Sequence, residues 1–84
     1  MVDVQHREND QKFVIRHGGN EAVLAYRLHS VGDAREIDFY STYVPPEFRG
    51  QGLAEKLVRT GLTWAREQGF QVHASCWYVA KFLR

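Results

Sequence analysis

Apolar and polar residues alternate along three stretches in the first half of the chain, about Phe13–His17, Ala22–His29 and Arg35–Val44. A period of two places neighbouring side chains on opposite faces of a strand. Gly18-Gly19-Asn20 and Val31-Gly32-Asp33 separate these stretches, and glycine and asparagine tolerate the positive φ of tight turns. The pattern predicts three strands joined as an antiparallel meander.

Strict alternation along the third stretch divides its side chains between two faces. One face is expected to carry Ile37, Phe39, Ser41 and Tyr43. The other is expected to carry Asp38, Tyr40, Thr42 and Val44.

Between Gly50 and Gln68 the apolar residues recur at helical spacing instead. They are Ala54, Leu57, Val58, Leu62 and Ala65. Gly61 lies inside this predicted helix at a cost of about 0.5–1 kcal/mol relative to alanine. We therefore expect the helix to pack closely against the sheet there, and we expect Gly69 to end it.

The last part of the chain contains one more strand and one more helix. Phe70–Ser75 alternates again, and the residues from Cys76 to Leu83 show helical spacing. A strand, a helix and a strand in succession form a parallel crossover. The whole pattern predicts one α/β domain, an α+β mixture in which a parallel pair follows the meander.

Composition sets bounds on this domain. The chain has 84 residues, of which 44% are hydrophobic and 13% aromatic, so we expect a single folded domain. The net charge of +1 gives no reason to expect nucleic acid or a membrane surface as partner. One cysteine cannot form an internal disulfide, which favours a reducing compartment, the cytoplasm.

The start of the chain is polar. Met1–Lys12 has no apolar core of the kind found in signal peptides, and no apolar run in the chain approaches the length of a membrane span. Met1–Gln11 is charged and irregular, and we expect a flexible lead-in there.

The chemistry is concentrated in Val44–Ala54, where two prolines and two glycines precede the long helix. A helix begins with N–H groups that have no partner within it, and its dipole favours an anion there. Glycines leave these amides accessible, and Arg49 adds a positive charge. Counted from Gly50, Glu55 and Leu57 stand where a P-loop requires glycine and serine or threonine, and Glu55 also stands where a dinucleotide fingerprint requires its third small residue. The stretch predicts a different phosphate cradle or, on a plainer interpretation, a surface turn that caps a helix.

The spacing Arg49-x-x-Gly52-x-Ala54 resembles the pyrophosphate signature of the GNAT superfamily of N-acetyltransferases, which bind acetyl-coenzyme A. The resemblance implies that the strands before and after the long helix splay apart to admit the pantetheine arm, and that an N–H near Val44 polarises the thioester carbonyl. It implies coenzyme A contacts from Tyr43, Val44, Phe48, Arg49, Gly50, Gln51, Gly52, Leu53 and Ala54.

Thr42-x-Val44-Pro45 and Cys76-Trp77-Tyr78 are similar to a small single-domain branch of that superfamily, which has a cysteine after the last strand. Cys76 would then act as a base or a nucleophile, or would be a buried small hydrophobe. Tyr78 would protonate the departing thiolate, or would be a half-buried aromatic residue. Relatives in this branch often have histidine where this chain has Ser41, so no histidine mechanism is implied on that strand.

The other candidates are assigned smaller roles. Trp77 is expected to pack, and His73 to be structural or to shuttle protons. No metal is expected, because the histidines at positions 6, 17 and 29 form with Cys76 no recognisable ligand spacing.

Three functions follow from these expectations. The first is an acetyl-coenzyme A-dependent N-acetyltransferase acting on a primary amine, such as a protein lysine, an N-terminus or a small amine. The second is a coenzyme A-binding module without turnover. The third is a structural domain that binds only incidental anions. The acceptor stays open, as does the choice between monomer and homodimer.

Overall fold

The computed structural model describes residues 3–48, 50 and 52–83. Its centre is one five-stranded sheet whose strands lie side by side in chain order. The strands are β1 (Val4–Arg7), β2 (Lys12–His17), β3 (Asn20–Val31), β4 (Ala34–Tyr43) and β5 (Gln71–Ala74). The helices are α1 (Leu53–Glu67) and α2 (Trp77–Ala80), with short 3-10 turns η1 (Glu8–Asp10), η2 (Pro46–Phe48) and η3 (Lys81–Leu83).

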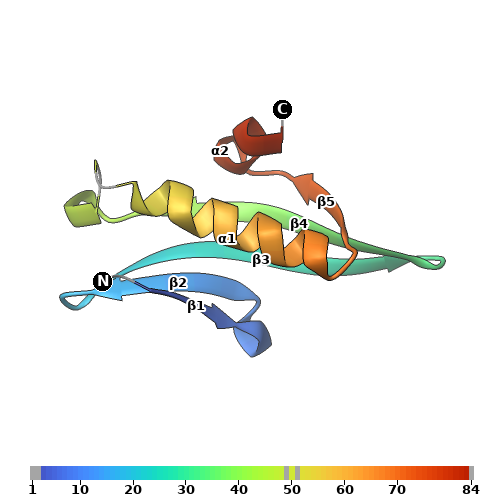
Figure 1. Ribbon diagram of the computed structural model, residues 1–84, viewed down its shortest axis with the longest axis horizontal. Helices are drawn as coiled ribbons and strands as arrows, with labels where there is room; N and C mark the ends of the chain where they lie inside the picture. Colours follow the sequence, from blue (N-terminus) through green and yellow to red (C-terminus); the bar gives the residue numbers. More distant parts are fainter. Residues whose placement is uncertain (1–2, 49, 51, 84) are drawn as a thin grey trace.

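The predicted topology is confirmed. β2, β3 and β4 pair antiparallel as a meander, and β5 returns after α1 to pair parallel with β4. In Figure 1, α1 lies across one face of this mixed sheet, and β5 leads upward into α2. The chain therefore forms a mixed α+β fold in which a βαβ unit follows the antiparallel strands.

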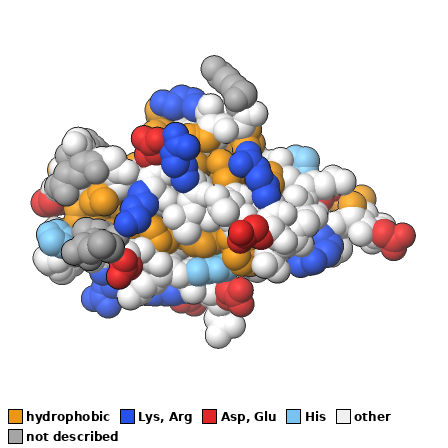
Figure 2. Space-filling model, viewed as in Figure 1, with side chains coloured by type: hydrophobic (Ala, Val, Ile, Leu, Met, Phe, Trp, Pro, Cys, Tyr) orange, Lys and Arg blue, Asp and Glu red, His pale blue; other side chains and the backbone are white. Residues whose placement is uncertain are grey.

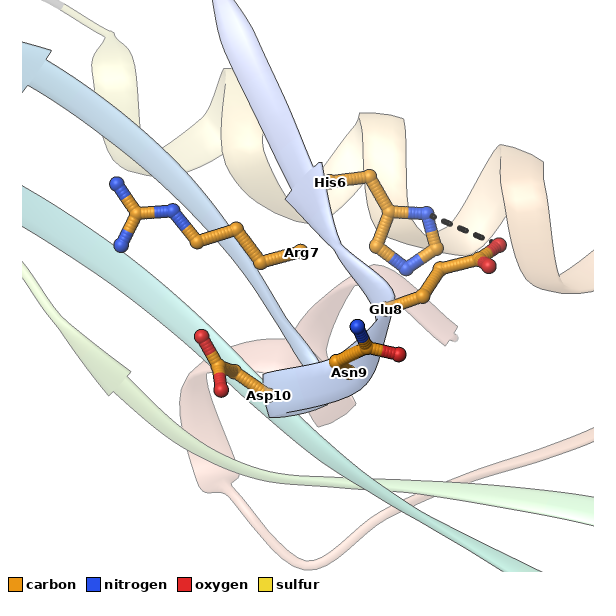
Figure 3. A pocket seen from close by; sticks show the side chains of 5 residues that line it. All are labelled: His6, Arg7, Glu8, Asn9 and Asp10. Carbon is orange, nitrogen blue, oxygen red and sulfur yellow. Dashed lines mark ion pairs between the residues drawn. The ribbon is translucent and has the colours of Figure 1, made fainter.

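The expectation of a flexible lead-in is wrong over the residues that the structure describes. β1 pairs antiparallel with β2, with Val4 opposite Ile15. Residues of β1 and η1 line a polar hollow of about 490 Å³ (Figure 3). The His6 ring stacks on Phe13 with 4.0 Å between ring centroids. A polar-looking segment is thus held by backbone pairing and by stacking of a histidine on the core.

The core lies between the sheet and α1. Its buried residues come from both layers: Phe13, Ile15, Ala22, Leu24, Tyr26, Ile37, Phe39, Phe48, Leu53, Leu57, Val58, Leu62, Ala65 and Val79. The close approach expected at Gly61 is confirmed, because a Cβ there would lie 2.7 Å from Leu24 Cδ2 and 3.2 Å from Phe39. Glycine at this position lets α1 settle onto β3 and β4.

An irregularity in β4 overturns the expected division of its side chains. Ala25 is opposite Ser41 while Tyr26 is opposite Phe39, so Tyr40 is an extra residue in the register. Beyond this bulge the alternation is reversed. Ser41 and Tyr43 are exposed although Phe39 is buried, and Thr42 lies opposite the buried Leu24. Thr42 therefore shares the face that α1 covers, contrary to the strict pattern.

The surface on the α1 side carries mixed charges. Figure 2 shows lysine and arginine side chains spread among acidic and apolar ones rather than gathered in a single patch. This agrees with a net charge of +1 and gives no sign of a dedicated nucleic-acid surface on that face.

Candidate functional site

Two glycines shape the turn that leads into α1. Gly50 has φ +83° and Gly52 has φ +73°, and, the adjacent residues aside, no atom lies within 4 Å of a Cβ built at either position. Backbone conformation, not crowding, therefore requires glycine here. Among the described residues, none outside the turn itself crowds either position.

The first turn of α1 offers backbone donors. Gly52 is the N-cap and has no side chain with which to cap the helix. The first bond across this end joins the Lys56 N–H to the Gly52 carbonyl at 3.1 Å. The N–H groups of Leu53, Ala54 and Glu55 precede this bond and lie at the positive end of the helix dipole.

A pocket of about 230 Å³ lies at this helix end. It is lined by Val44, Phe48, Gly50, Gly52, Leu53, Ala54, Glu55 and Tyr78. Six of these are predicted coenzyme A contacts, which the structure brings together. Arg49 and Gln51 lie outside the described residues, and Tyr43 does not line the pocket.

Not every residue that lines this pocket is available to a ligand, and one of them was not predicted to line it. Phe48 is 1% exposed and Leu53 is 9% exposed, so both belong chiefly to the core and form the pocket floor. Glu55 was not predicted. It lies in the first turn of α1 and is paired with Arg59 at 2.6 Å.

β4 and β5 stop pairing close to this pocket. Their parallel pairing ends with Phe39 opposite Ala74, and one further bond runs from the Cys76 N–H to the Phe39 carbonyl at 3.1 Å. β4 then continues to Tyr43, whereas the segment that follows β5 turns into α2 (Figure 1). The two segments therefore diverge beyond Phe39, as the predicted splay requires.

Cys76 lies at the point of divergence. It is half-buried, it is the N-cap of α2, and its Sγ lies 3.6 Å from Thr42 Oγ1. Burial alone would raise the pKa of this thiol. The nearby N–H of Val79, the Thr42 hydroxyl and the N–H groups of Tyr78 and Thr42 favour the thiolate, outweigh burial and lower the pKa below its ordinary value.

Tyr78 lies close to Cys76 in the sequence and also lines the pocket. It is two residues beyond Cys76 and lines the pocket at the start of α1. Burial, and then the charge of Glu55, raise the pKa of its hydroxyl above the usual value. The phenol therefore keeps its proton at neutral pH.

The comparison with known families agrees with this geometry. A family model described as GCN5-related N-acetyl-transferase matches residues 12–84. The chain belongs to the GCN5-related N-acetyltransferase family.

Relatives in vertebrates extend the match over nearly the whole chain. Protein NATD1 of Bos taurus is 34% identical over 85 residues, covering 99% of this chain and 73% of the relative. Protein NATD1 of Homo sapiens is 33% identical over 85 residues, with the same coverage of both chains. Protein NATD1 of Danio rerio is 32% identical over 83 residues, covering 96% of this chain and 73% of the relative.

Thr42 is the functional candidate that reasoning from the sequence missed within this acetyltransferase fold. It stood in the motif that carries the resemblance, but strict alternation placed it on the opposite face from the core. The bulge at Tyr40 turns its hydroxyl toward Cys76. An aromatic residue in the middle of an alternating strand gave no signal of this reversal.

The remaining candidates lie away from the pocket. His73 pairs with Glu36, Nε2 to Oε1 at 3.1 Å, and Trp77 is 72% exposed, so the expectation that Trp77 packs is wrong. Among the described residues, no group of His, Cys, Asp and Glu side chains could hold a metal ion. Within the same part of the chain, no helix combines the length and apolar character needed to cross a membrane.

Proposed function

We propose that this family member transfers an acetyl group from acetyl-coenzyme A, which the family generally uses, to a primary amine. The observation that carries the proposal is the pocket that joins Gly50, Gly52 and Ala54 to Val44 and Tyr78. It lies where β4 and β5 diverge at Cys76. This arrangement supports the proposal, because a glycine turn at a helix start, the divergence of β4 and β5 and a thiol whose pKa is lowered lie in one part of the fold.

The residues present fit the diphosphate of such a substrate. Gly50 and Gly52 leave open space above the backbone, and the N–H groups of the first turn of α1 favour a bound anion. Val44 follows the free end of β4 and lines the same pocket. Its backbone and that of Tyr43 would align the extended arm, whose thioester supplies an activated acetyl group.

Cys76 and Tyr78 would handle protons. A lysine amine has a pKa of about 10.4 and attacks only when neutral. A Cys76 thiolate, stabilised by its hydrogen bonds, would remove the proton of the acceptor ammonium. Tyr78, held protonated beside the pocket, would supply a proton to the departing sulfur. A nucleophilic role for Cys76 would retain the same surroundings and is distinguished by trapping an acetylated cysteine.

Binding and turnover are tested separately. We expect coenzyme A to raise Tm in proportion to the logarithm of its concentration. With acetyl-coenzyme A and a panel of lysine peptides, N-terminal peptides and polyamines, we expect free thiol to appear at a rate set by the amine. A Tm that coenzyme A leaves unchanged contradicts the proposal.

Cys76→Ala identifies the proton acceptor. We expect this variant to retain the Tm increase with coenzyme A and to lose most thiol release. Unchanged turnover would remove the cysteine from the mechanism. Binding without turnover for any amine, in the wild-type protein, would instead identify a coenzyme A-binding module.

A further inference from the structure

Asp38 makes an unusual set of contacts on the face of the sheet opposite α1. Its Oδ1 accepts hydrogen bonds from the Ser75 N–H at 2.9 Å and from the Ser75 hydroxyl at 3.0 Å. The same hydroxyl lies 2.8 Å from Oδ2, and Arg27 Nη2 donates to Oδ2 at 3.4 Å. The Asp38 side chain is 14% exposed. One carboxylate therefore holds both the backbone and the side chain of a single residue.

The residue that it holds is the one just before Cys76. Regular pairing between β4 and β5 stops at Phe39 and Ala74, so the strand ladder does not direct the chain beyond that point. The hydrogen bonds between Asp38 and Ser75 hold the segment after β5 to β4 for one more residue. The Cys76 N–H then meets the Phe39 carbonyl at 3.1 Å, and α2 begins.

We propose that Asp38 is a positioning residue for Cys76. Its carboxylate clamps Ser75 from one face of the sheet, and this clamp sets where Cys76 Sγ lies on the other face, beside Thr42 and the N–H groups of α2. The proposal deepens the function proposed above and rests on it for the catalytic meaning of Cys76. That Asp38 sets the position of the Cys76 thiol does not depend on the proposed function.

The charge of Asp38 and its clamp act on the thiol in opposite directions. A nearby negative charge disfavours a thiolate, so removing the charge alone lowers the pKa of the thiol. Loss of the clamp releases Cys76 from its hydrogen-bond donors and raises that pKa. Other titratable or charged groups near Asp38 are Arg27 on β3, His73 opposite it on β5 and Glu36 on β4. Near Cys76 the corresponding group is Tyr78, whose hydroxyl in turn is influenced by the Glu55 carboxylate.

The test measures the reactivity of Cys76 as a function of pH. The chain has one cysteine, so alkylation by iodoacetamide, followed by mass spectrometry, reports this thiol alone. We expect Asp38→Ala to move the midpoint of the rate profile upward by about 0.5–1 pH unit. Alkylation at neutral pH would then fall roughly threefold to tenfold. Asp38→Asn keeps an oxygen acceptor for the Ser75 N–H and should leave the midpoint unchanged or slightly lower.

Glu36→Ala is the matched control. Glu36 is a carboxylate two residues earlier on the same face of β4, and it contacts His73 rather than Ser75. We expect wild-type alkylation from this variant. If Asp38→Ala does not fold, Ser75→Ala carries the test, because it removes both hydroxyl contacts and is expected to raise the midpoint by a smaller amount.

The outcomes separate the two proposals. The positioning role is overturned by a folded Asp38→Ala protein whose midpoint is no higher than that of Asp38→Asn, or by a folded Ser75→Ala protein whose midpoint stays at or below the wild-type value. Raised midpoints in both variants, with a wild-type value in Glu36→Ala, support it. None of these measurements requires acetyl-coenzyme A. A protein that never binds coenzyme A would therefore lose the proposed enzyme function without deciding the role of Asp38.

Discussion

Thr42 Oγ1 lies 3.6 Å from Cys76 Sγ, and this contact bridges the two segments that diverge at the edge of the sheet. Thr42 belongs to β4 beyond its bulge, and Cys76 is the N-cap of α2. The hydroxyl and the N–H of Thr42 both favour the thiolate. The bulge at Tyr40 therefore has a chemical consequence, because it brings a donor to the cysteine.

Replacing Thr42 with valine removes this hydroxyl with little change in shape. We expect the pKa of the Cys76 thiol to rise by about 0.5–1 unit, since one donor to the charged form is lost while three backbone N–H groups remain. Acetyl transfer near pH 7 should fall roughly threefold to tenfold. Thr63→Val, an exposed substitution of the same kind on α1, is the control. An unchanged pH–rate profile in Thr42→Val would show that the hydroxyl does not act on the thiol.

The sequence predicted the order of strands and helices because period-two and helical patterns follow directly from which side chains are buried. The stretches around Phe13, Leu24 and Ile37 and the apolar stripe of α1 were each continuous enough to indicate their element. The glycine turn before α1 was also predictable, since Gly50 and Gly52 both have positive φ there; its role as a phosphate cradle stays a prediction.

Features that depend on a local break in pattern were not predictable. The bulge at Tyr40 changes the face of Thr42 without any proline or glycine to mark it. β1 was missed because its residues are mostly polar, and its stability comes from pairing with β2 and from His6 stacked on Phe13. The clamp between Asp38 and Ser75 joins residues 37 positions apart, a distance over which local periodicity carries no information.

Gly52→Ala should lower the affinity for coenzyme A, and it should destabilise the fold no more than a matched glycine substitution elsewhere. Positive φ costs an alanine about 1–2 kcal/mol, and the substitution either strains the turn or tilts the amides of α1 away from the pocket. Gly32→Ala is the control, because Gly32 has φ +60° and an open surrounding in the β3–β4 turn. Both variants should lose similar stability to urea. Equal coenzyme A affinity in the two, measured by calorimetry, would contradict a role for the Gly52 turn in binding.

Gly61→Ala tests the close packing of α1 on the sheet. Alanine gains about 1 kcal/mol in helix propensity, but its Cβ would lie 2.7 Å from Leu24 Cδ2. Overpacking of this kind costs about 1–3 kcal/mol. We expect a net loss of stability in urea unfolding, whereas Thr63→Ala, at an exposed position of the same helix, should be neutral or stabilising. A more stable Gly61→Ala protein would mean that Leu24 can rotate away at little cost.

Acid should destabilise the fold through His6. Its Nε2 lies 2.7 Å from the buried Tyr26 hydroxyl, and its ring faces Glu8 across 3.9 Å (Figure 3). Burial lowers the pKa of His6 from 6.5, although the charge of Glu8 opposes this. The unfolded chain therefore binds the proton more readily, so stability is full above pH 6.5 and is lost as pH falls through the folded pKa.

His6→Gln separates this effect from other acid-sensitive groups. The glutamine amide can donate to or accept from the Tyr26 hydroxyl but does not titrate in this range. We expect Tm of the wild-type protein to fall between pH 7.5 and pH 5 by about 3 °C more than that of His6→Gln. His29→Gln, at an exposed position on β3, should follow the wild-type curve. Parallel curves for wild type and His6→Gln would show that protonation of His6 does not oppose folding, and the stacking on Phe13 would then have to accommodate an imidazolium.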